Sequence, residues 1–213
     1  MDTTHIIIIE PEVLLRDLLH QALQQHAHSR VVAFAGSVEE GLRACNEHPA
    51  QLLIVEWQLP DGTGLDLVRQ LGSKFAGLRI LMLSANEKEG VVRNAAENGV
   101  HGFVSKHQPL TTFQEAIHAL LAGKCYYCPT SSRMLLEAMK TPAAHNTAAL
   151  TPREWEILRV LAEGHSTREM ARRLKLSPKT VANHITSLKE KLGIQEPAGL
   201  VRFALRQGLI EIH

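Results

Sequence analysis

Residues 52–65 read LLIVEWQLPDGTGL, in which four apolar residues lead into an acid and then into a segment rich in proline and glycine. A short apolar run bounded by turn residues is typical of a buried strand in a parallel sheet. The proline and the glycines predict a turn before the next helix. Glu56 is therefore expected at the carboxyl end of a buried strand, which is where open α/β sheets bind their ligands.

Four similar apolar runs occur on either side of this strand in the sequence. They are HIIIIE at 5–10, VVAFAG at 31–36, RILMLS at 79–84 and GFVSK at 102–106. Each is followed by roughly 10 to 15 residues with the spacing of an amphipathic helix. This alternation predicts an α/β domain over residues 1–123, with a doubly wound, five-stranded parallel sheet.

Polar side chains end four of these runs. They are Glu10, Glu56, Ser84 and Lys106. Because the carboxyl ends of parallel strands meet at one edge of a sheet, we expect the four side chains to converge on one crevice. The alternative for each of them singly is a solvated loop residue, since strand ends open onto polar loops.

Residues 124–149 are predicted to form a linker. A short helix over Ser131–Met139 is followed by the small and polar residues Thr141–Thr147, which favour a flexible tether between loosely joined domains. Cys125 and Cys128 in this segment have the spacing of a redox or metal pair. The alternative is a pair of ordinary packing thiols, because the sequence supplies no further metal ligands nearby.

Residues 150–213 carry the signals of four short helices. Thr151–Glu154 and Ser166–Glu169 are capping boxes, Ser177 precedes a proline at a helix start, and Gly193 is a typical left-handed helix end. A fourth helix is expected near Pro197. Short helices joined by a tight turn between the second and third predict an all-α helix-turn-helix domain.

The predicted third helix, residues 178–192, has two distinct faces. Val181, Ile185, Leu188 and Leu192 fall within one narrow arc and are expected in the core. The opposite face is expected to display short hydrogen-bonding groups and amines, namely Lys179, Asn183 and Thr186, with Ala182 and Lys189 at its edge. Such a face suits insertion into the major groove of double-stranded DNA, and the alternative is a basic, solvated face of a protein-interaction module.

The distribution of charge points the same way. The whole chain has a formal net charge of +1, but residues 150–213 hold 11 Lys and Arg against 7 Asp and Glu, which leaves 12 against 15 before them. The excess of +4 in the second part indicates a polyanionic partner for that part alone. The amino terminus lacks the features of a secretory signal and no apolar run is long enough to span a bilayer, so we expect a cytoplasmic protein.

The loop from Glu56 to Leu65 resembles the phospho-acceptor loop of response-regulator receiver domains. This resemblance places Glu56 where the family has its acceptor aspartate, and Ser84 and Lys106 match the family's hydroxyl residue and lysine. The acidic pair that holds magnesium in the family corresponds to Glu10 and Pro11. Phe103 matches the family's aromatic switch residue.

Residues 150–194, LTPREWEILRVLAEGHSTREMARRLKLSPKTVANHITSLKEKLGI, closely resemble the LuxR-type DNA-binding domain. The two resemblances together identify the chain as a response regulator of the NarL/FixJ class. They imply that the third helix, including Thr180, enters the major groove, and that the fourth supports homodimers on two half-sites. The apolar stripe expected for that contact is Ala198, Val201, Ala204 and Leu205.

The departures at Pro11 and Glu56 predict an atypical pocket. One carboxylate is missing and the acceptor is longer by one methylene, so we expect magnesium binding to be weak or absent, with no other cofactor and no enzymatic activity. The prediction is a sequence-specific transcription regulator that is independent of phosphorylation, with a partner protein or ligand at the receiver-like domain. The alternatives are a kinase-controlled regulator that tolerates Glu56, and a regulator that acts through protein interactions of the receiver.

Overall fold

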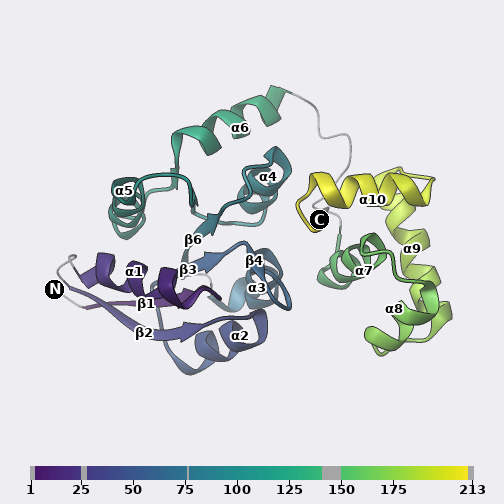
Figure 1. The fold of residues 1–213 in the computed structure, drawn as a ribbon, viewed down its shortest axis with the longest axis horizontal. Helices are drawn as coiled ribbons and strands as arrows, with labels where there is room; N and C mark the ends of the chain where they lie inside the picture. Colours follow the sequence, from purple (N-terminus) through teal and green to yellow (C-terminus); the bar gives the residue numbers. More distant parts are fainter. Residues whose placement is uncertain (1–2, 25–27, 76, 141–149, 211–213) are drawn as a thin grey trace.

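The computed structural model describes residues 3–24, 28–75, 77–140 and 150–210. Its first part contains a parallel six-stranded sheet in the order β2-β1-β3-β6-β7-β8 (Figure 1). The strands of this sheet are β1 (Thr4–Ile9), β2 (Ser29–Ala35), β3 (Leu52–Glu56), β6 (Arg79–Ser84), β7 (Gly102–Ser105) and β8 (Tyr126–Tyr127). A small antiparallel hairpin follows β3 and consists of β4 (Gln58–Leu59) and β5 (Gly62–Thr63).

Helices cover both faces of the sheet. One face packs against α1 (Val13–Gln24) and α5 (Leu110–Leu121), and the other against α2 (Val38–Glu47), α3 (Gly64–Leu71) and α4 (Glu89–Glu97). A 3-10 turn, Gly72–Phe75, follows α3. Side chains alternate along β1, so that Ile6 and Ile8 join the core under α1 and α5 while Ile7 and Ile9 join the core on the other side. The predicted doubly wound α/β fold and its five strands are confirmed.

The structure corrects the predicted linker. Tyr126 and Tyr127 form the sixth strand beside β7, and α6 (Pro129–Lys140) packs Met134 and Leu135 against the core of the α/β domain. Residues 126–140 therefore continue this domain. The sequence did not indicate this strand, because two residues are too few to form a recognisable apolar run. The strand depends instead on its pairing with β7 in the tertiary structure. The expected tether Thr141–Thr147 lies outside the described residues.

The CxxC motif is divided by this edge strand. Cys128 is buried, and its thiol lies 3.1 Å from the hydroxyl of Ser131, whereas Cys125 is exposed. Both are free thiols. Side chains three positions apart on an extended chain point to opposite sides. Cys125 and Cys128 therefore do not face each other as a redox or metal pair would.

The second part is the predicted four-helix domain. It consists of α7 (Pro152–Ala162), α8 (Thr167–Arg173), α9 (Pro178–Leu192) and α10 (Pro197–Arg206) around Trp155, Leu188 and Phe203. Both capping boxes, the Ser177 cap and the left-handed Gly193 are present. Across the described ranges, no helix is both long and apolar enough to cross a membrane.

Candidate functional site

The four polar strand ends do converge. The sheet order makes β1, β3, β6 and β7 consecutive neighbours, so Glu10, Glu56, Ser84 and Lys106 follow or end four adjacent strands. Three of these residues, Glu10, Glu56 and Ser84, are buried. A cavity at this edge is lined by Glu56, Ser84 and Lys106, among others. The expectation of solvated loop residues does not describe this cluster.

Lys106 is the centre of the cluster. Its ammonium nitrogen lies 2.5 Å from Glu56 Oε2, 3.0 Å from Glu10 Oε2 and 3.8 Å from Glu12 Oε1. The first two carboxylates are buried, with side chains 5% and 1% exposed, whereas Glu12 is 73% exposed. Glu56 and Glu10, which were both expected at this edge of the sheet, therefore both contact the Lys106 ammonium.

Backbone amides hold the remaining carboxylate oxygens in place. Gln58 donates its backbone N–H to Glu56 Oε1 at 2.8 Å, and Glu12 donates its own to Glu10 Oε1 at 3.1 Å. Each buried carboxylate thus has one oxygen bound to the backbone and the other facing the ammonium. Hydrogen bonds to the charged form of a carboxylate stabilise that form.

The electrostatics favour a charged lysine. Burial by itself lowers the pKa of a lysine, but the hydrogen bonds and charges of Glu56 and Glu10 outweigh burial and raise the pKa of Lys106 above its ordinary value. Burial raises the pKa of Glu56, and this effect outweighs the Gln58 amide and Lys106, which act to lower it. Lys106 is therefore a protonated cation held between two buried acids.

Ser84 lines the same cavity as Glu56 and Lys106, and Phe103 lies in β7, the strand that precedes Lys106. The hydroxyl of Ser84 accepts a hydrogen bond from the backbone of Asn86 at 2.9 Å, within its own loop. Phe103 is fully buried in the core on the α4 side of the sheet. Its ring is thus turned inward, away from the molecular surface.

The residues present do not fit a magnesium ion well. Magnesium requires several oxygen ligands in near-octahedral geometry. Pro11 has no ligating side chain, and the facing oxygens of Glu10 and Glu56 already contact the Lys106 ammonium. Within the described ranges, no group of three or more His, Cys, Asp or Glu side chains is arranged to hold a metal.

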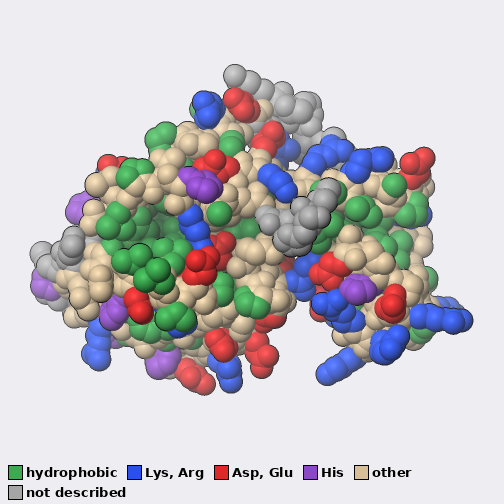
Figure 2. Space-filling model, in the orientation of Figure 1, with side chains coloured by type: hydrophobic (Ala, Val, Ile, Leu, Met, Phe, Trp, Pro, Cys, Tyr) green, Lys and Arg blue, Asp and Glu red, His purple; other side chains and the backbone are tan. Residues whose placement is uncertain are grey.

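The predicted recognition helix is α9. Val181, Leu188 and Leu192 are buried, as expected for the core face of this helix. Ile185, which was also expected in the core, is half-buried. Of the opposite face, Lys179, Ala182, Asn183 and Thr186 are exposed, and Thr180 and Lys189 are half-buried. Figure 2 shows Lys and Arg side chains projecting from the helix-turn-helix part of the molecule. This face therefore offers one exposed amine, one half-buried amine and an exposed amide for contact with a polyanion.

Two hydroxyls on α9 already have local partners. Thr186 Oγ1 donates to the carbonyl of Ala182 at 3.1 Å, and the hydroxyl of Thr180 lies 2.8 Å from that of Ser177. Asn183 and Lys179 are consequently the better candidates for direct contact with a partner.

The prediction is wrong for one residue of the dimer stripe. Ala204 is fully buried in the helix-turn-helix core with Leu200 and Phe203, because it lies one helical turn after Leu200 on the same face of α10. Ala198 is exposed, and Val201 and Leu205 are half-buried. A surface on α10 can use these three residues but not Ala204.

A buried acid organises this domain, although the sequence indicates only its capping role. Glu154 accepts hydrogen bonds from the Thr151 backbone, the Ser187 hydroxyl and the Lys191 ammonium, at 2.7–2.8 Å. Burial acts to raise its pKa, but these bonds prevail and lower the pKa of Glu154 to about 2. Glu154 thus ties the start of α7 to α9 and fixes the position of the candidate recognition helix.

The two domains contact each other directly, contrary to the expectation of loose joining. On α4, Asn94 donates its side-chain amide to Gln207 at 2.6 Å. Between α3 and α7, the guanidinium of Arg69 lies 4.0 Å from the centre of the Trp155 ring, and Arg159 lies 3.7 Å from Asp66. These residues are far apart in the sequence, and no local pattern marks them as an interface.

Comparisons with known proteins agree with this architecture. Residues 6–118 match the response regulator receiver domain, and residues 148–204 match the luxR family of bacterial regulatory proteins. The transcriptional activator protein ExaE of Pseudomonas putida is 33% identical over 210 residues, which cover 97% of this chain and 98% of ExaE. The transcriptional regulatory protein UhpA of Escherichia coli K12 is 32% identical over 197 residues, 92% of this chain and 95% of UhpA.

A solved structure of the RcsB response regulator of Salmonella typhimurium superposes with a TM-score of 0.66 at 25% identity, over 97% of this chain and 99% of RcsB. The match thus includes both domains. The chain belongs to the response regulators that join a receiver domain to a LuxR-type helix-turn-helix domain, a family of DNA-binding transcriptional regulators.

Proposed function

We propose that this protein is a sequence-specific transcription regulator whose receiver domain works without accepting a phosphoryl group. The observation that carries the proposal is the ion cluster in which Lys106 contacts Glu56 and Glu10 at 2.5 and 3.0 Å. The lysine that would neutralise an incoming phosphoryl group is already neutralised by side chains of the chain itself.

The geometry of the acceptor position supports the same conclusion. Phosphoryl transfer depends on positioning and charge neutralisation, so a nucleophile displaced by about 1 Å reacts poorly. Glu56 Oε1 is held by the Gln58 amide and Oε2 by Lys106, which restrains the carboxylate in place. Weak or absent magnesium binding follows from the missing ligand at Pro11, and the protein acts as a regulator rather than an enzyme.

The pocket also resembles part of a phosphorylated state. A carboxylate beside the lysine supplies one negative charge, whereas a phosphoryl group supplies up to two and further acceptor atoms. The receiver is therefore proposed to respond to a partner protein or a ligand instead of a kinase, in the cytoplasm.

The second domain is proposed to bind double-stranded DNA through α9. Lys179 and Lys189 would contact phosphates, and Asn183 and Ala182 would read base edges in the major groove. The exposed or half-buried Ala198, Val201 and Leu205 on α10 would join two copies on two half-sites. The similar proteins support this proposal, because the solved RcsB structure concerns DNA interaction by that protein and ExaE is named a transcriptional activator.

Intact mass spectrometry after incubation with acetyl phosphate and magnesium tests the proposal. The natural protein should gain no phosphoryl mass, and a Pro11→Asp/Glu56→Asp double variant, which restores the family's acidic ligand and acceptor, is the positive control. A stable phosphoryl increment on the natural protein that Glu56→Ala removes would overturn the proposal and favour the kinase-controlled alternative. Selection of bound duplexes that yields no sequence motif would favour the protein-interaction alternative.

A further inference from the structure

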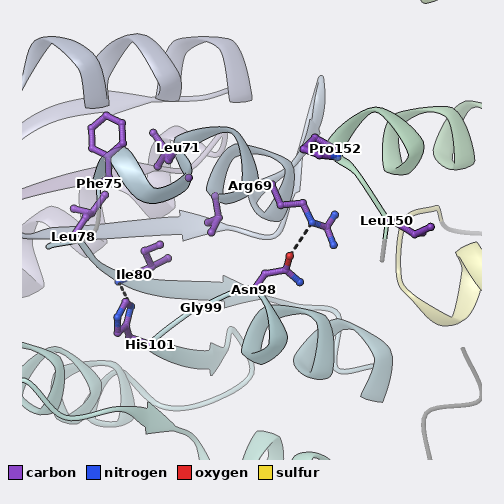
Figure 3. A pocket seen from close by; sticks show the side chains of 12 residues that line it. Arg69, Leu71, Phe75, Leu78, Ile80, Asn98, Gly99, His101, Leu150 and Pro152 are labelled. Carbon is purple, nitrogen blue, oxygen red and sulfur yellow. Dashed lines mark hydrogen bonds between the residues drawn. The ribbon is translucent and has the colours of Figure 1, made fainter. Parts of the chain in front are cut away.

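A cavity of about 440 Å³ lies at the boundary of the two domains, away from the Lys106 cluster (Figure 3). The receiver domain contributes most of its wall, including Val68, Leu71, Phe75 and Ile80, and the helix-turn-helix domain contributes Leu150 and Pro152. Its volume falls within the range of pockets that hold small molecules, and such pockets occur preferentially between domains. Most of the wall is apolar, so an occupant would need an apolar body.

The polar part of the wall contains a buried cation. The side chain of Arg69 is only 7% exposed, and its Nη1 and Nη2 atoms are buried without a hydrogen-bond partner among the described residues. Its Nε donates to Asn98 Oδ1 at 3.0 Å (Figure 3). Nη1 lies 3.8 Å from Asp66 Oδ1, which is beyond hydrogen-bond distance. A buried guanidinium is usually paired and hydrogen-bonded, so the unmet donors of Arg69 mark a place for an acceptor.

The remaining polar groups also favour an anion. The Nδ1 atom of His101 accepts a hydrogen bond from the backbone of Ile80 at 3.2 Å, which leaves Nε2 as the N–H donor of a neutral ring. Burial and the charge of Arg79 lower the pKa of His101, which keeps the ring neutral. Asn98 already donates its amide to the carbonyl of Asn94 at 2.8 Å and accepts from Arg69. Among the described residues that line the cavity there is no Asp or Glu, which leaves donors and one positive charge.

We infer that this cavity binds a small amphipathic carboxylate, whose carboxyl group pairs with Arg69 and whose apolar body lies against Leu71, Phe75 and Ile80. A guanidinium binds a carboxylate through two parallel N–H···O bonds, and neither Nη1 nor Nη2 has a hydrogen-bond partner among the described residues. The site is separate from the Lys106 cluster and does not depend on how that cluster functions.

Ligand binding at this site is coupled to the contact between the domains. One face of the Arg69 guanidinium is covered by Trp155 of α7 at 4.0 Å, and its Nη atoms are out of contact with solvent in this arrangement. A carboxylate reaches them when α7 shifts relative to α3. The ligand therefore competes with a contact that holds the two domains together.

Isothermal titration of the full-length protein with hexanoate and benzoate tests the inference, with hexanol and benzyl alcohol as the uncharged counterparts. We expect saturable binding of at least one carboxylate and at least tenfold weaker binding of its alcohol, since a charge-assisted hydrogen bond is lost. The Arg69→Gln variant should weaken carboxylate binding by at least tenfold. The control is Arg43→Gln, an exposed arginine on α2 outside the cavity, which should bind as the natural protein does.

Thermal unfolding of Arg69→Gln establishes that the variant is folded before its binding is compared. As a second variant that leaves Arg69 in place, Ile80→Phe narrows the apolar end and should weaken benzoate binding. Equal affinity of the natural protein and folded Arg69→Gln, equal affinity for acid and alcohol, or no saturable binding of either carboxylate would overturn the inference.

Discussion

The indole nitrogen of Trp57 donates a hydrogen bond to the backbone carbonyl of Gly208 at 3.2 Å, and so connects the residue after Glu56 to the end of the helix-turn-helix domain. Trp57 is fully buried in the receiver core, and Gly208 lies two residues beyond α10. A displacement of the carboxyl end of β3 can therefore be transmitted to the end of α10 through Trp57 alone. This contact links the ion cluster directly to the domain proposed to bind DNA.

Replacing Trp57 with phenylalanine should weaken the contact between the domains. The variant keeps an aromatic ring but loses the indole N–H, a hydrogen bond worth about 1 kcal/mol, together with part of the buried ring. NMR relaxation should show faster and more independent tumbling of the helix-turn-helix domain. Tyr127→Phe is a control for the loss of a hydrogen bond, because it removes the bond to Val100 within the receiver domain. Identical relaxation of natural protein and Trp57→Phe would show that the contact does not hold the domains together.

Gly90 allows α10 to approach α4. A Cβ atom at this position would lie 2.1 Å from the carbonyl oxygen of Arg206, which backbone atoms cannot accommodate. Gly90→Ala should therefore separate the domains and increase the radius of gyration in small-angle X-ray scattering, while both cores stay folded. Gly77→Ala, where a Cβ would meet no atom within 4 Å, should leave the scattering unchanged. An unchanged radius for Gly90→Ala would mean that the close α4–α10 contact is rare in solution.

Removing the charge of Lys106 should destabilise the receiver domain strongly. Lys106→Met leaves Glu10 and Glu56 buried without a counter-charge, a change that costs about 3–5 kcal/mol when one partner of a buried pair is lost. The raised pKa of Lys106 means that its stabilisation is present below the ordinary lysine pKa and is lost as the pH rises through the higher folded value. Denaturant unfolding at neutral pH measures the effect.

Two further variants make the Lys106 experiment specific. Adding Glu10→Gln and Glu56→Gln to Lys106→Met should recover much of the lost stability, because no buried charge remains. Glu12→Gln, at an exposed acid 3.8 Å from the ammonium, should change the stability by less than about 1 kcal/mol. A Lys106→Met variant as stable as the natural protein would show that the cluster is energetically unimportant.

Substitutions on α9 should separate affinity from sequence recognition. Lys179→Ala should weaken binding to all duplexes and reduce the salt dependence by about one phosphate contact, whereas Asn183→Ala should relax the preference at one base pair and cost about 1–3 kcal/mol on the preferred site. Salt titrations on selected and scrambled duplexes measure both effects. Arg43→Ala on α2 serves as a control for the loss of a positive charge. If neither α9 variant alters binding, another surface contacts the DNA.

The low pKa of Glu154 predicts an acid-dependent loss of stability in the helix-turn-helix domain. A carboxyl group with a folded pKa of about 2, against an ordinary value of 4.5, contributes stability above pH 4.5 that is lost as the pH falls toward 2. Glu154→Gln should cost about 2 kcal/mol at neutral pH, and its difference from the natural protein should shrink over that range. Glu156→Gln is the control, a partly exposed acid paired with Arg153. If the difference in stability between Glu154→Gln and the natural protein does not vary with pH, the effect comes from packing and not from the charge of Glu154.

Local patterns in the sequence determined five strands of the sheet, the helix starts of the second domain and the fold class. Apolar runs such as 52–55 specify buried strands, and Thr151, Ser166 and Ser177 mark helix starts because caps act on backbone groups within one turn. The unusual residues at Glu56 and Pro11 were also evident from the sequence. So was the exposed face of α9, because helical periodicity places side chains on faces without reference to the rest of the fold.

Only the tertiary structure decided how these pieces meet. Three findings depend on which elements become neighbours in the fold. They are the contact of both Glu10 and Glu56 with one ammonium, the extension of the sheet by Tyr126–Tyr127, and the burial of Ala204. The contacts of Trp57 with Gly208 and of Arg69 with Trp155 join residues separated by most of one domain or more. Their energies come from burial and distance in three dimensions, and a linear pattern of residue types contains neither quantity.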